Sequence, residues 1–443
     1  MNLQSLLAAR VDAGKPVRAG LIGAGKFGSM FLAQVPSIAG LDVALICDRD
    51  VERAKMACKT VGWDSSRIAR TRFADNGRAA CTDERVDVVI EATGDPAAGI
   101  AHALAAIDAK KPVVMVNVEA DALAGGYLAA KARAANVVYS MAYGDQPALI
   151  SEMVDWARSA GFTVAAAGKG TKYLPAYHTV TPDGVWQHYG LTADEAKKAG
   201  MNSQMFNSFL DGTKSAIEMA AVANACDLDV PHDGLHFPPC GADELASVLR
   251  PKALGGVIER DGMVEVVSSL KRDGAPVERD LRWGVYVVLK AQNDYAAACF
   301  KQYGLPTDAT GRYAAMYKPF HLIGLELSIS VLNVALRGEP TGSFRAWRGD
   351  AVAVAKRALK AGEMLDGEGG YTVYAKPIPA ERSLKLGGLP IGLAHHVKLV
   401  RDVAAGEFLR AADVTLDESS QAVRVRRDME QDARQAGRVL AAE

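Results

Sequence analysis

The sequence of 443 residues lacks several features that mark specialised proteins. It has no apolar run of about 18 residues, the length that a membrane-spanning helix needs. Its six cysteines form no CxxC pair and no cysteine–histidine cluster with zinc-finger spacing. The net charge of -1 provides no global attraction to nucleic acid or to an anionic membrane. Internal repeats and low-complexity tracts are also absent.

The overall composition is that of an ordinary globular protein, with 49% hydrophobic and 23% charged residues. A chain of this length exceeds one compact core, so we expect two or three domains. The N-terminal stretch MNLQSLLAARVDAGK lacks the apolar region of an export signal. We therefore expect a cytoplasmic protein whose cysteines are free thiols.

The first third of the chain alternates strand and helix patterns. Strands are expected in VRAGLIGAG, LDVALICDRD, VDVVIEATGD, KPVVMVNVEAD and NVVYSMAYGD, and helices in KFGSMFLAQVPSI, VERAKMACKTVG and PAAGIAHALAAIDAKK. Repeated strand–helix units imply a parallel sheet with right-handed crossovers. Residues 1–155 are therefore predicted to form an α/β domain with a doubly wound Rossmann sheet.

The pattern changes after residue 151. Helices are expected over ALISEMVDWARSAG, Asn202–Cys226, Leu281–Tyr303 and Tyr317–Leu336, a strand begins FTVAAAGKGTKY, and Pro231–Glu278 suggests strands and loops. This predicts a central α+β substrate domain over residues 156–345. Short strands followed by a charged helix predict a small, mainly-β domain over residues 346–443. Apolar side chains of the Tyr317–Leu336 helix are candidates for a homodimer contact.

A nucleotide site is predicted by LIGAGKFGSM, which places Gly23, Gly25 and Gly28 between a strand and a helix. The first glycine permits a tight turn, the second lets a pyrophosphate approach the backbone, and the third lets helix and strand pack closely. Asp48 closes the second strand, where a ribose-binding carboxylate belongs. Arg49 follows it, and a guanidinium binds the 2′-phosphate of NADP. The choice between NADPH and NADH stays open.

The predicted cofactor contacts extend to neighbouring residues. They are Gly23, Gly25, Lys26, Phe27, Gly28, Asp48, Arg49, Ala92, Thr93 and Gly94. The last three end the VVIEATG strand, where a nicotinamide ribose lies in such folds.

A narrow polar stripe is predicted on the helix MFNSFLDGTKSAIEMAAVANA. Asn207, Asp211, Lys214 and Glu218 recur at helical spacing on an otherwise apolar surface. Such a helix is buried, with the stripe lining a cavity that holds substrate. The alternative is an internal ion-pair ladder that holds two helices in register.

The segment AAAGKGTKYLPAYHTVTPDGVWQHYG is predicted to bind an anionic group. Glycines flank Lys169 and allow unusual backbone angles, and Lys172 adds a second cation. His178 and His188 are candidates for proton transfer because the pKa of histidine lies near neutrality. The alternative is a solvated loop in which each histidine satisfies only local hydrogen bonds.

Two further pairs of side chains are candidates for ligand binding. Lys318 and His321 are three residues apart and share a helix face in this interpretation, or decorate the start of that helix. Glu119 and Asp145 each follow an apolar strand, so their carboxylates are candidate ligands for Mg²⁺ or Mn²⁺.

The glycine turn, the VIEATGD and KPVVMVN strands and the DGTK of the central helix resemble homoserine dehydrogenases. That resemblance implies that Asp211 and Lys214 serve hydride transfer. In that family, a strand is followed by an asparagine and a lysine. In this sequence, Val118 occupies the position of that lysine.

The whole chain resembles the 1-deoxy-D-xylulose 5-phosphate reductoisomerase-like proteins. The resemblance is carried by GKGTKYLPAYHTVTPDGVW, FLDGTKSAIEM and YKPFHLIGLEL, while LPIGLAHHVKLVRDVAAGEFLRAADVTLDE resembles the SAF type of small β domain. It implies NADPH-dependent conversion of 1-deoxy-D-xylulose 5-phosphate to 2-C-methyl-D-erythritol 4-phosphate, an isoprenoid precursor, with a divalent metal.

The site residues receive roles in this interpretation. Catalytic roles are assigned to Asp211, Lys214, Lys169 and His178, and substrate binding to Lys172, Asn207, Lys318 and His321. The expected partner is a small phosphorylated or carboxylated molecule. One alternative is an NAD(P)-dependent dehydrogenase of homoserine or of a hydroxy or sugar acid. Another is a non-catalytic nucleotide-binding regulator.

Overall fold

The fold is known from a computed structural model that describes residues 2–440, with side chains as far as residue 435. The chain forms two compact units. The first contains the residues up to Glu152, the segment His321–Phe344 and the residues from Arg424 onward; the second contains Met153–Phe320 and Arg345–Val423. The segment predicted as a separate C-terminal domain is therefore divided between the two units. No described helix is both long and apolar enough to cross a membrane.

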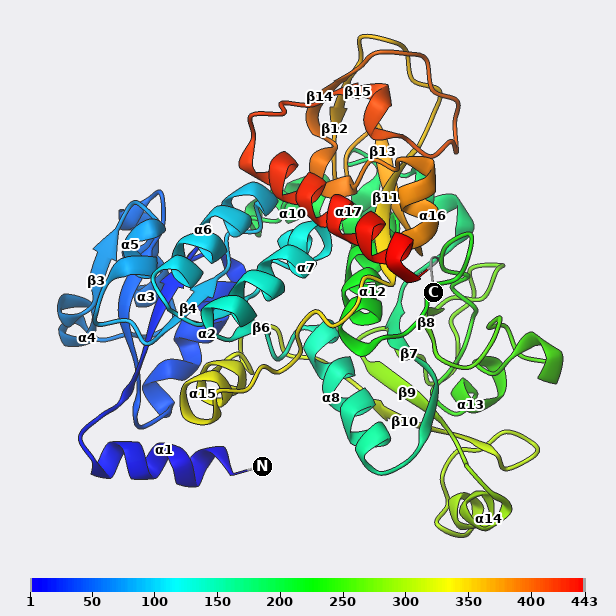
Figure 1. Cartoon of the computed structure of the whole chain (residues 1–443), viewed down its shortest axis with the longest axis horizontal. Coiled ribbons are helices and arrows are strands. Elements are labelled where there is room, and N and C mark those ends of the chain that lie inside the picture. The colour runs from blue at the N-terminus through cyan, green and yellow to red at the C-terminus, as the bar shows by residue number, and fades with distance from the viewer. Residues whose placement is uncertain (1, 441–443) are drawn as a thin grey trace. The chain divides into compact units, whose positions relative to one another are not determined.

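The first unit is built on a six-stranded sheet, whose strands run through the blue and cyan part of the chain (Figure 1). The strands are β1 (Val17–Ile22), β2 (Leu41–Cys47), β3 (Arg72–Ala74), β4 (Val88–Glu91), β5 (Val113–Met115) and β6 (Tyr139–Met141). Their order is β3-β2-β1-β4-β5-β6, and all neighbours are parallel. This confirms the predicted doubly wound α/β fold. The order reverses between β1 and β4, where such sheets bind ligands at their carboxyl ends.

Several helices of this part of the chain connect the strands, and others precede or follow the sheet in sequence. They are α1 (Leu3–Asp12), α2 (Lys26–Gln34), α3 (Val51–Thr60), α4 (Ser65–Arg70), α5 (Arg78–Thr82), α6 (Pro96–Asp108), α7 (Val118–Ala135), α15 (Ser328–Arg337) and α17 (Gln421–Leu440), with α8 (Gln146–Ser159) leading into the second unit. Several begin at a side chain that accepts a backbone N–H, as Asp50 does for α3 and Asp95 for α6. Such caps satisfy groups that a helix terminus leaves unpaired.

The predicted helix over Tyr317–Leu336 is wrong in its first half. Residues Tyr313–Lys318 form strand β10, Pro319 follows it, and the helix begins only at Ser328. The apolar side chains of α15, including Val331 and Leu332, pack into the core of the first unit. These side chains therefore pack inside the protein and do not serve as the expected dimer contact. The homodimer itself stays a prediction.

The second unit contains a mixed sheet of four strands. They are β7 (Thr163–Thr171), β8 (Met263–Ser268), β9 (Val285–Lys290) and β10 (Tyr313–Lys318), in the order β10-β9-β7-β8. Only β7 and β8 are parallel. The remaining helices of this region are α9 (Val185–Tyr189), α10 (Ala193–Lys198), α11 (Ser203–Leu210), α12 (Thr213–Cys226), α13 (Leu245–Val248) and α14 (Asp294–Gln302), with a 3₁₀ turn over Pro175–Thr179. The predicted α+β class is confirmed.

The predicted helix over Leu281–Tyr303 is wrong in its first half. Its first part, VYVVLK, is strand β9, and a helix starts only after Asn293, whose side chain accepts the N–H of Ala296. The run VYVVL is continuously apolar, a pattern shared by a buried strand and a buried helix. Pairing with β7 on one side and β10 on the other selects the strand.

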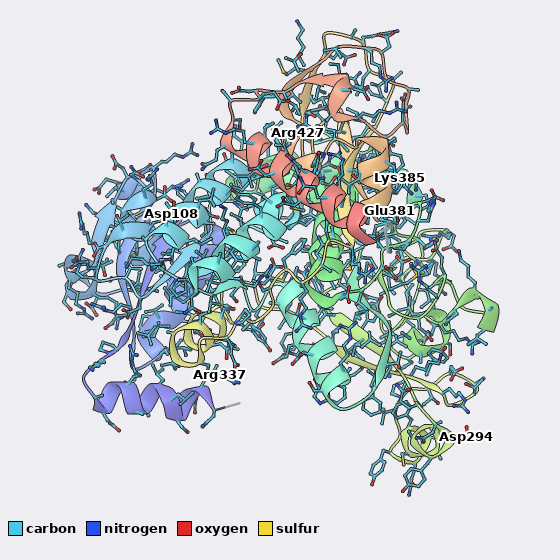
Figure 2. The ribbon with its side chains drawn as sticks, in the orientation of Figure 1. Asp108, Asp294, Arg337, Glu381, Lys385 and Arg427 are labelled. Atoms are coloured by element: carbon cyan, nitrogen blue, oxygen red, sulfur yellow. The ribbon has the colours of Figure 1, made fainter. Side chains whose placement is uncertain are left out.

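The segment after residue 345 is mainly β, as predicted. Strands β11 (Gly349–Ala355) and β13 (Val373–Pro379) form one antiparallel pair, while β12 (Met364–Asp366), β14 (His395–Leu399) and β15 (Val414–Thr415) form a second small sheet. Between them lies α16 (Ala380–Leu386), on which Glu381 and Lys385 form an exposed ion pair one turn apart (Figure 2). Its identity as an SAF domain stays a prediction. All six cysteines are free thiols, as expected.

Candidate active site

The glycine turn has the geometry that its spacing predicts. Gly23 adopts φ +96°, and a Cβ there would lie 2.5 Å from the carbonyl oxygen of Ala92. A Cβ on Gly28 would lie 2.4 Å from the carbonyl oxygen of Gly23, so only glycine lets α2 pack this closely. Gly25 is exposed, precedes α2, and would place a Cβ in open space.

The start of α2 is open to an anionic ligand. Lys26 and Phe27 form its first turn, whose backbone N–H groups have no acceptor within the helix. The positive end of the helix dipole adds attraction for phosphate. The residues present thus fit a dinucleotide pyrophosphate.

Asp48 is already engaged by protein groups. Its carboxylate accepts N–H groups of Ala24 at 2.9 Å and Asp50 at 3.0 Å, and pairs with Arg53 at 2.7 Å. Burial by itself raises the pKa of Asp48, but these hydrogen bonds and the Arg53 charge outweigh burial and lower that pKa. Arg49 lies exposed beside it. The sequence did not single out Arg53, whose charge compensates the acid expected to meet the ribose.

The end of β4 carries a polar network beside the glycine turn. Thr93 donates to Glu91 at 2.6 Å, and the Asn117 amide donates to the Asp95 carbonyl at 2.8 Å. His102 lies 3.1 Å from the same Glu91 oxygen, while the other Glu91 oxygen is buried without a hydrogen bond among the described residues. Ala92 forms one wall of the Gly23 turn. Gly94, which follows Thr93, adopts φ +74°.

The proposed metal ligands occupy separate elements of the first unit. Glu119 lies in the first turn of α7, and Asp145 accepts the N–H of Gln146 at 2.9 Å. Across the described part of the chain, no three or more His, Cys, Asp or Glu residues gather into a metal-binding group. The two carboxylates stay a prediction, and the residues here do not by themselves form a metal site.

Lys169 does not lie in a ligand-binding loop as predicted, because β7 continues through it to Thr171. Its buried ammonium pairs with Glu218. The flanking glycines have ordinary backbone angles; a Cβ on Gly168 would lie 1.8 Å from the carbonyl oxygen of Glu265, and one on Gly170 would lie 1.9 Å from that of Leu281. The glycines therefore admit neighbouring protein backbone, and Lys169 is part of a buried ion pair.

The single polar stripe is also wrong, because the expected long helix is broken. Gly212 adopts φ +91° between α11 and α12, and Asp211 accepts the N–H of Thr213 at 2.8 Å. The left-handed residue turns the chain, so positions before and after it no longer share one face. Lys214 lies half-buried near the start of α12.

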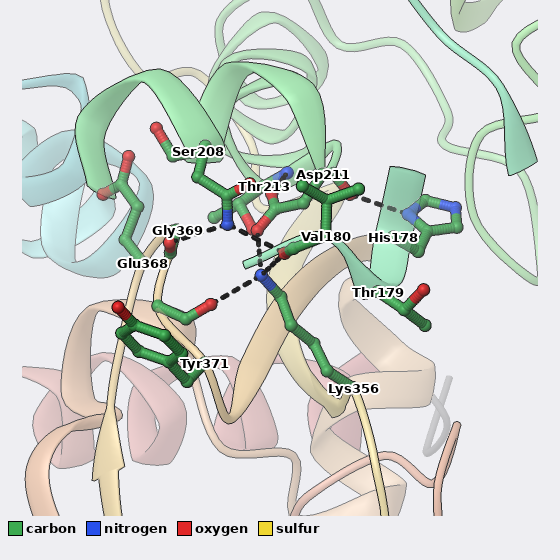
Figure 3. Close-up of polar contacts among 12 residues, drawn as sticks. His178, Thr179, Val180, Ser208, Asp211, Thr213, Lys356, Glu368, Gly369 and Tyr371 are labelled. Atoms are coloured by element: carbon green, nitrogen blue, oxygen red, sulfur yellow. Dashed lines mark hydrogen bonds and ion pairs between the residues drawn. The ribbon is translucent and has the colours of Figure 1, made fainter. Parts of the chain in front are cut away.

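Asp211 belongs instead to a closed hub of buried polar groups (Figure 3). Lys356, at the end of β11, places its ammonium 2.7 Å from the Asp211 carboxylate and donates to the carbonyls of Val180 at 2.8 Å and Gly370 at 2.7 Å. The Asn207 amide donates to the carbonyls of Val180 and Gly369. Burial raises the pKa of Asp211, while the Lys356 charge acts in the opposite direction.

This hub is structural. The side chains of Asp211 and Lys356 are 0% and 2% exposed, and all three ammonium donors have partners. Asn207 holds two backbone segments together in the same way. Asp211 and Asn207 both bind protein groups here, and their predicted roles toward substrate stay a prediction. The spacing of residues in the sequence contained no signal for Lys356, which lies far along the chain.

His178 is held in one orientation by two hydrogen bonds. Its Nδ1 lies 2.7 Å from the Asp211 carbonyl, which only accepts, so Nδ1 carries the proton. Its Nε2 then accepts from the hydroxyl of Tyr173 at 3.0 Å. Burial lowers the pKa of His178 to about 4, so the ring is neutral near pH 7. Tyr374 stacks on this ring at 4.5 Å between centroids.

Tyr173 was not among the predicted catalytic residues. Its ring stacks on Phe237 at 4.0 Å between centroids, and burial raises its pKa. Phe237 adopts φ +50°, a left-handed conformation that is rare for a bulky residue. Buried Glu265 accepts the N–H groups of His236 and Phe237 and so holds this turn. The Tyr173 hydroxyl is thus hydrogen-bonded to the neutral His178 ring.

Lys318 and His321 do not share a helix face. Lys318 ends strand β10 in the second unit, whereas His321 lies in a loop of the first unit before α15. Lys172 lies just past β7 and donates to the carbonyl of His188.

Two protein-family models match the chain. Residues 22–141 match the model described as "Homoserine dehydrogenase, NAD binding domain", and residues 144–327 match the model described as "Oxidoreductase DRL, catalytic domain". The chain joins an NAD-binding domain to an oxidoreductase catalytic domain. The second match includes the Tyr173, His178 and Asp211 cluster.

Several solved structures are similar to parts of the chain. A probable dehydrogenase from Thermotoga maritima is 12% identical, covering 73% of this chain and 90% of that one with a TM-score of 0.38. An oxidoreductase from Agrobacterium radiobacter, solved with NAD+, L-tartaric acid and magnesium, is 19% identical, covering 36% and 45% with a TM-score of 0.28. A DOX-P reductoisomerase in complex with magnesium is 14% identical, covering 48% and 58% with a TM-score of 0.34.

The chain spans about half the length of the first solved structures that it matches. None of the curated proteins compared with the chain matches it.

Proposed function

We propose that the protein is an NADP-dependent oxidoreductase acting on a small phosphorylated sugar. Conversion of 1-deoxy-D-xylulose 5-phosphate to 2-C-methyl-D-erythritol 4-phosphate is the specific reaction proposed. The observation that carries the proposal is an open glycine turn, in an NAD-binding domain, on the same chain as an oxidoreductase catalytic domain. A nicotinamide cofactor supplies the hydride exchange, and the chain's own residues bind, orient and transfer protons.

Binding of the dinucleotide is assigned to the start of α2. The exposed Gly25 leaves room for the pyrophosphate, and the N–H groups of Lys26 and Phe27 are free to donate to it. The preference for NADP rests on Arg49 and Arg53, because the charge of Asp48 is already compensated. A guanidinium forms two parallel hydrogen bonds with a phosphate, which supports binding of the 2′-phosphate.

Proton transfer is assigned to Tyr173 and His178. In the oxidative direction, the substrate hydroxyl gives its proton to the Tyr173 oxygen while Tyr173 gives its own proton to His178 Nε2. The neutral ring with Nδ1 bound to the Asp211 carbonyl is the form that can accept this proton. Reduction follows the same path in reverse. Asp211 acts here as a positioning residue, through its backbone carbonyl.

No step is assigned to a metal, because the described residues do not assemble a metal site. Glu119 and Asp145 remain the proposed contacts for Mg²⁺ or Mn²⁺, which the resemblance to reductoisomerases implies.

A second candidate is an NAD(P)-dependent dehydrogenase of homoserine or of a hydroxy or sugar acid. It is favoured by the match of residues 22–141 to the NAD-binding domain of homoserine dehydrogenases. The same cofactor site and the same proton path serve that reaction without isomerisation.

The deciding experiment is an assay of the purified protein for NADPH consumption. The substrates are 1-deoxy-D-xylulose 5-phosphate, with and without Mg²⁺ or Mn²⁺, and the semialdehyde substrate of homoserine dehydrogenases. Turnover of the phosphosugar supports the first candidate, and turnover of the semialdehyde supports the second. Saturable NADPH binding without turnover of any phosphosugar or hydroxy acid would contradict both and favour a regulator.

The proton path is tested with Tyr173→Phe. This substitution keeps the ring stacked on Phe237 and removes only the hydroxyl, so kcat is expected to fall by about 10²–10⁴. KM and cofactor affinity are expected to stay near their original values. An unchanged kcat would remove Tyr173 from the mechanism.

A further inference from the structure

Two neighbouring cations of the second unit lack the acidic partners that several of its arginines have. Arg250, Arg260 and Arg279 each pair with a carboxylate at 2.7 Å. Among the side chains that the structure describes, no carboxylate pairs with Lys172 or Arg282. Lys172 donates to the His188 carbonyl, and the Arg282 guanidinium contacts the aromatic rings of Tyr189 and Trp283.

Both cations face the same aromatic ring. The Lys172 ammonium and the Arg282 guanidinium each lie 5.9 Å from the centroid of Tyr189. Burial and the charge of Arg282 both lower the pKa of Lys172, which shows that the two charges act on each other. Two half-buried like charges beside the same ring repel each other, and an anion bound to both removes that repulsion.

The backbone brings these residues together. Gly170 lies near the end of β7. A Cβ on this residue would lie 1.9 Å from the carbonyl oxygen of Leu281 and 2.9 Å from the backbone nitrogen of Arg282, so the absence of a side chain allows this close approach. The Asp280 carboxylate accepts the backbone N–H of Arg282 at 2.8 Å, so this nearby carboxylate binds a backbone group. Arg282 is thereby fixed beside Lys172, which emerges one residue beyond β7.

Ring side chains lie beside the two cations. His188 and Tyr177 have ring centroids 4.9 Å apart, and Arg282 stacks over the exposed Trp283 at 4.7 Å. Burial and the Lys172 charge lower the pKa of His188, so its ring is neutral near pH 7. A neutral imidazole is able to donate one hydrogen bond to an anion without adding charge.

We propose that Lys172 and Arg282, with His188 and Tyr189 beside them, bind the phosphate of a phosphomonoester substrate. The fork of Arg282 suits two phosphate oxygens and the compact Lys172 ammonium a third. Two cations without carboxylates match the double charge of a phosphomonoester better than the single charge of a carboxylate. This subsite deepens the proposed function by naming the phosphate group as the feature that the protein selects.

The experiment measures binding directly and needs no turnover. Calorimetric titration of the full chain with glycerol 3-phosphate is compared with titration with glycerol. We expect saturable binding of the phosphomonoester only. Arg282→Met and Lys172→Met are each expected to weaken that binding by at least about tenfold, the effect of losing a charged hydrogen bond.

Arg279→Met is the matched control. It removes the same side chain three residues away, where the guanidinium pairs with Asp243, so phosphomonoester binding should be unchanged. Arg282→Lys keeps the charge without the fork and should bind with intermediate affinity, which also separates a lost contact from a misfolded variant. Equal binding by Arg282→Met and the original protein, or equal weakening by Arg279→Met, would overturn the subsite.

A parallel titration with NADPH distinguishes two sources of phosphate. If the site serves substrate, NADPH affinity is the same in Arg282→Met and the original protein; a loss of NADPH affinity would show a cofactor phosphate there and overturn the inference. NADPH binding without phosphomonoester binding refutes this subsite and leaves the proposed function standing. Phosphomonoester binding that depends on Arg282, with no NADPH binding, leaves the subsite standing and refutes the proposed function.

Discussion

Replacing Lys356 with Met should destabilise the second unit strongly, because it removes the counter-ion of a fully buried carboxylate. Asp211 is 0% exposed, and Lys356 is its ion-pair partner at 2.7 Å. Breaking a buried pair by removing one partner costs about 3–5 kcal/mol. The Gly370 carbonyl also loses its ammonium donor, whereas the Val180 carbonyl keeps the hydrogen bond from Asn207. We therefore expect a loss of about 3–5 kcal/mol in the free energy of unfolding.

The loss should depend on pH in a defined direction. Without the ammonium, the pKa of Asp211 in the folded protein rises further, while in the unfolded chain it stays near its usual value of about 3.9. Above that value the unfolded state ionises more easily than the folded state. The deficit of Lys356→Met should thus be smallest near pH 4 and grow as the pH rises.

Urea unfolding, followed by tryptophan fluorescence at several pH values, measures this effect. Lys385→Met is the control, since that lysine forms an exposed pair with Glu381 on α16 and should change the midpoint little (Figure 2). Adding Asp211→Asn to Lys356→Met should recover part of the lost stability, because the buried charge is gone. A double variant as unstable as Lys356→Met, or a deficit independent of pH, would refute the reasoning.

Three further outcomes are expected. Burial raises the pKa of Asp121 to about 6, so the ionised carboxylate destabilises the folded protein increasingly as the pH rises from about 4 to 6. Asp121→Asn keeps an acceptor for the Tyr139 hydroxyl, and in thermal unfolding it should gain up to about 3 kcal/mol above pH 6 and nothing near pH 4. Gly25→Val should leave the unfolding temperature nearly unchanged, since its Cβ meets open space, yet weaken NADPH binding at least about tenfold in a fluorescence titration. Arg49→Ala should weaken NADPH about tenfold while NADH affinity stays constant; equal effects on both cofactors would count against a 2′-phosphate contact.

The sequence by itself was sufficient for the features that depend on neighbours in the chain. The spacing of Gly23, Gly25 and Gly28 between a strand and a helix predicted the turn, and the backbone leaves no room for a side chain at Gly23 or Gly28. The alternation of apolar strands and helices predicted the parallel sheet, although the short strand β3 was missed. Both features depend on interactions among residues close in the sequence, so the hydrophobic period and the glycine spacing are enough to predict them.

Tertiary structure decided everything that depends on distant partners. VYVVLK became a strand because β7 and β10 flank it, and Gly212 divided an expected single helix. Asp211 pairs with Lys356 across 145 positions of sequence. Burial in a low-dielectric interior makes the nearest counter-ion in space decisive, and spacing along the chain does not contain that information.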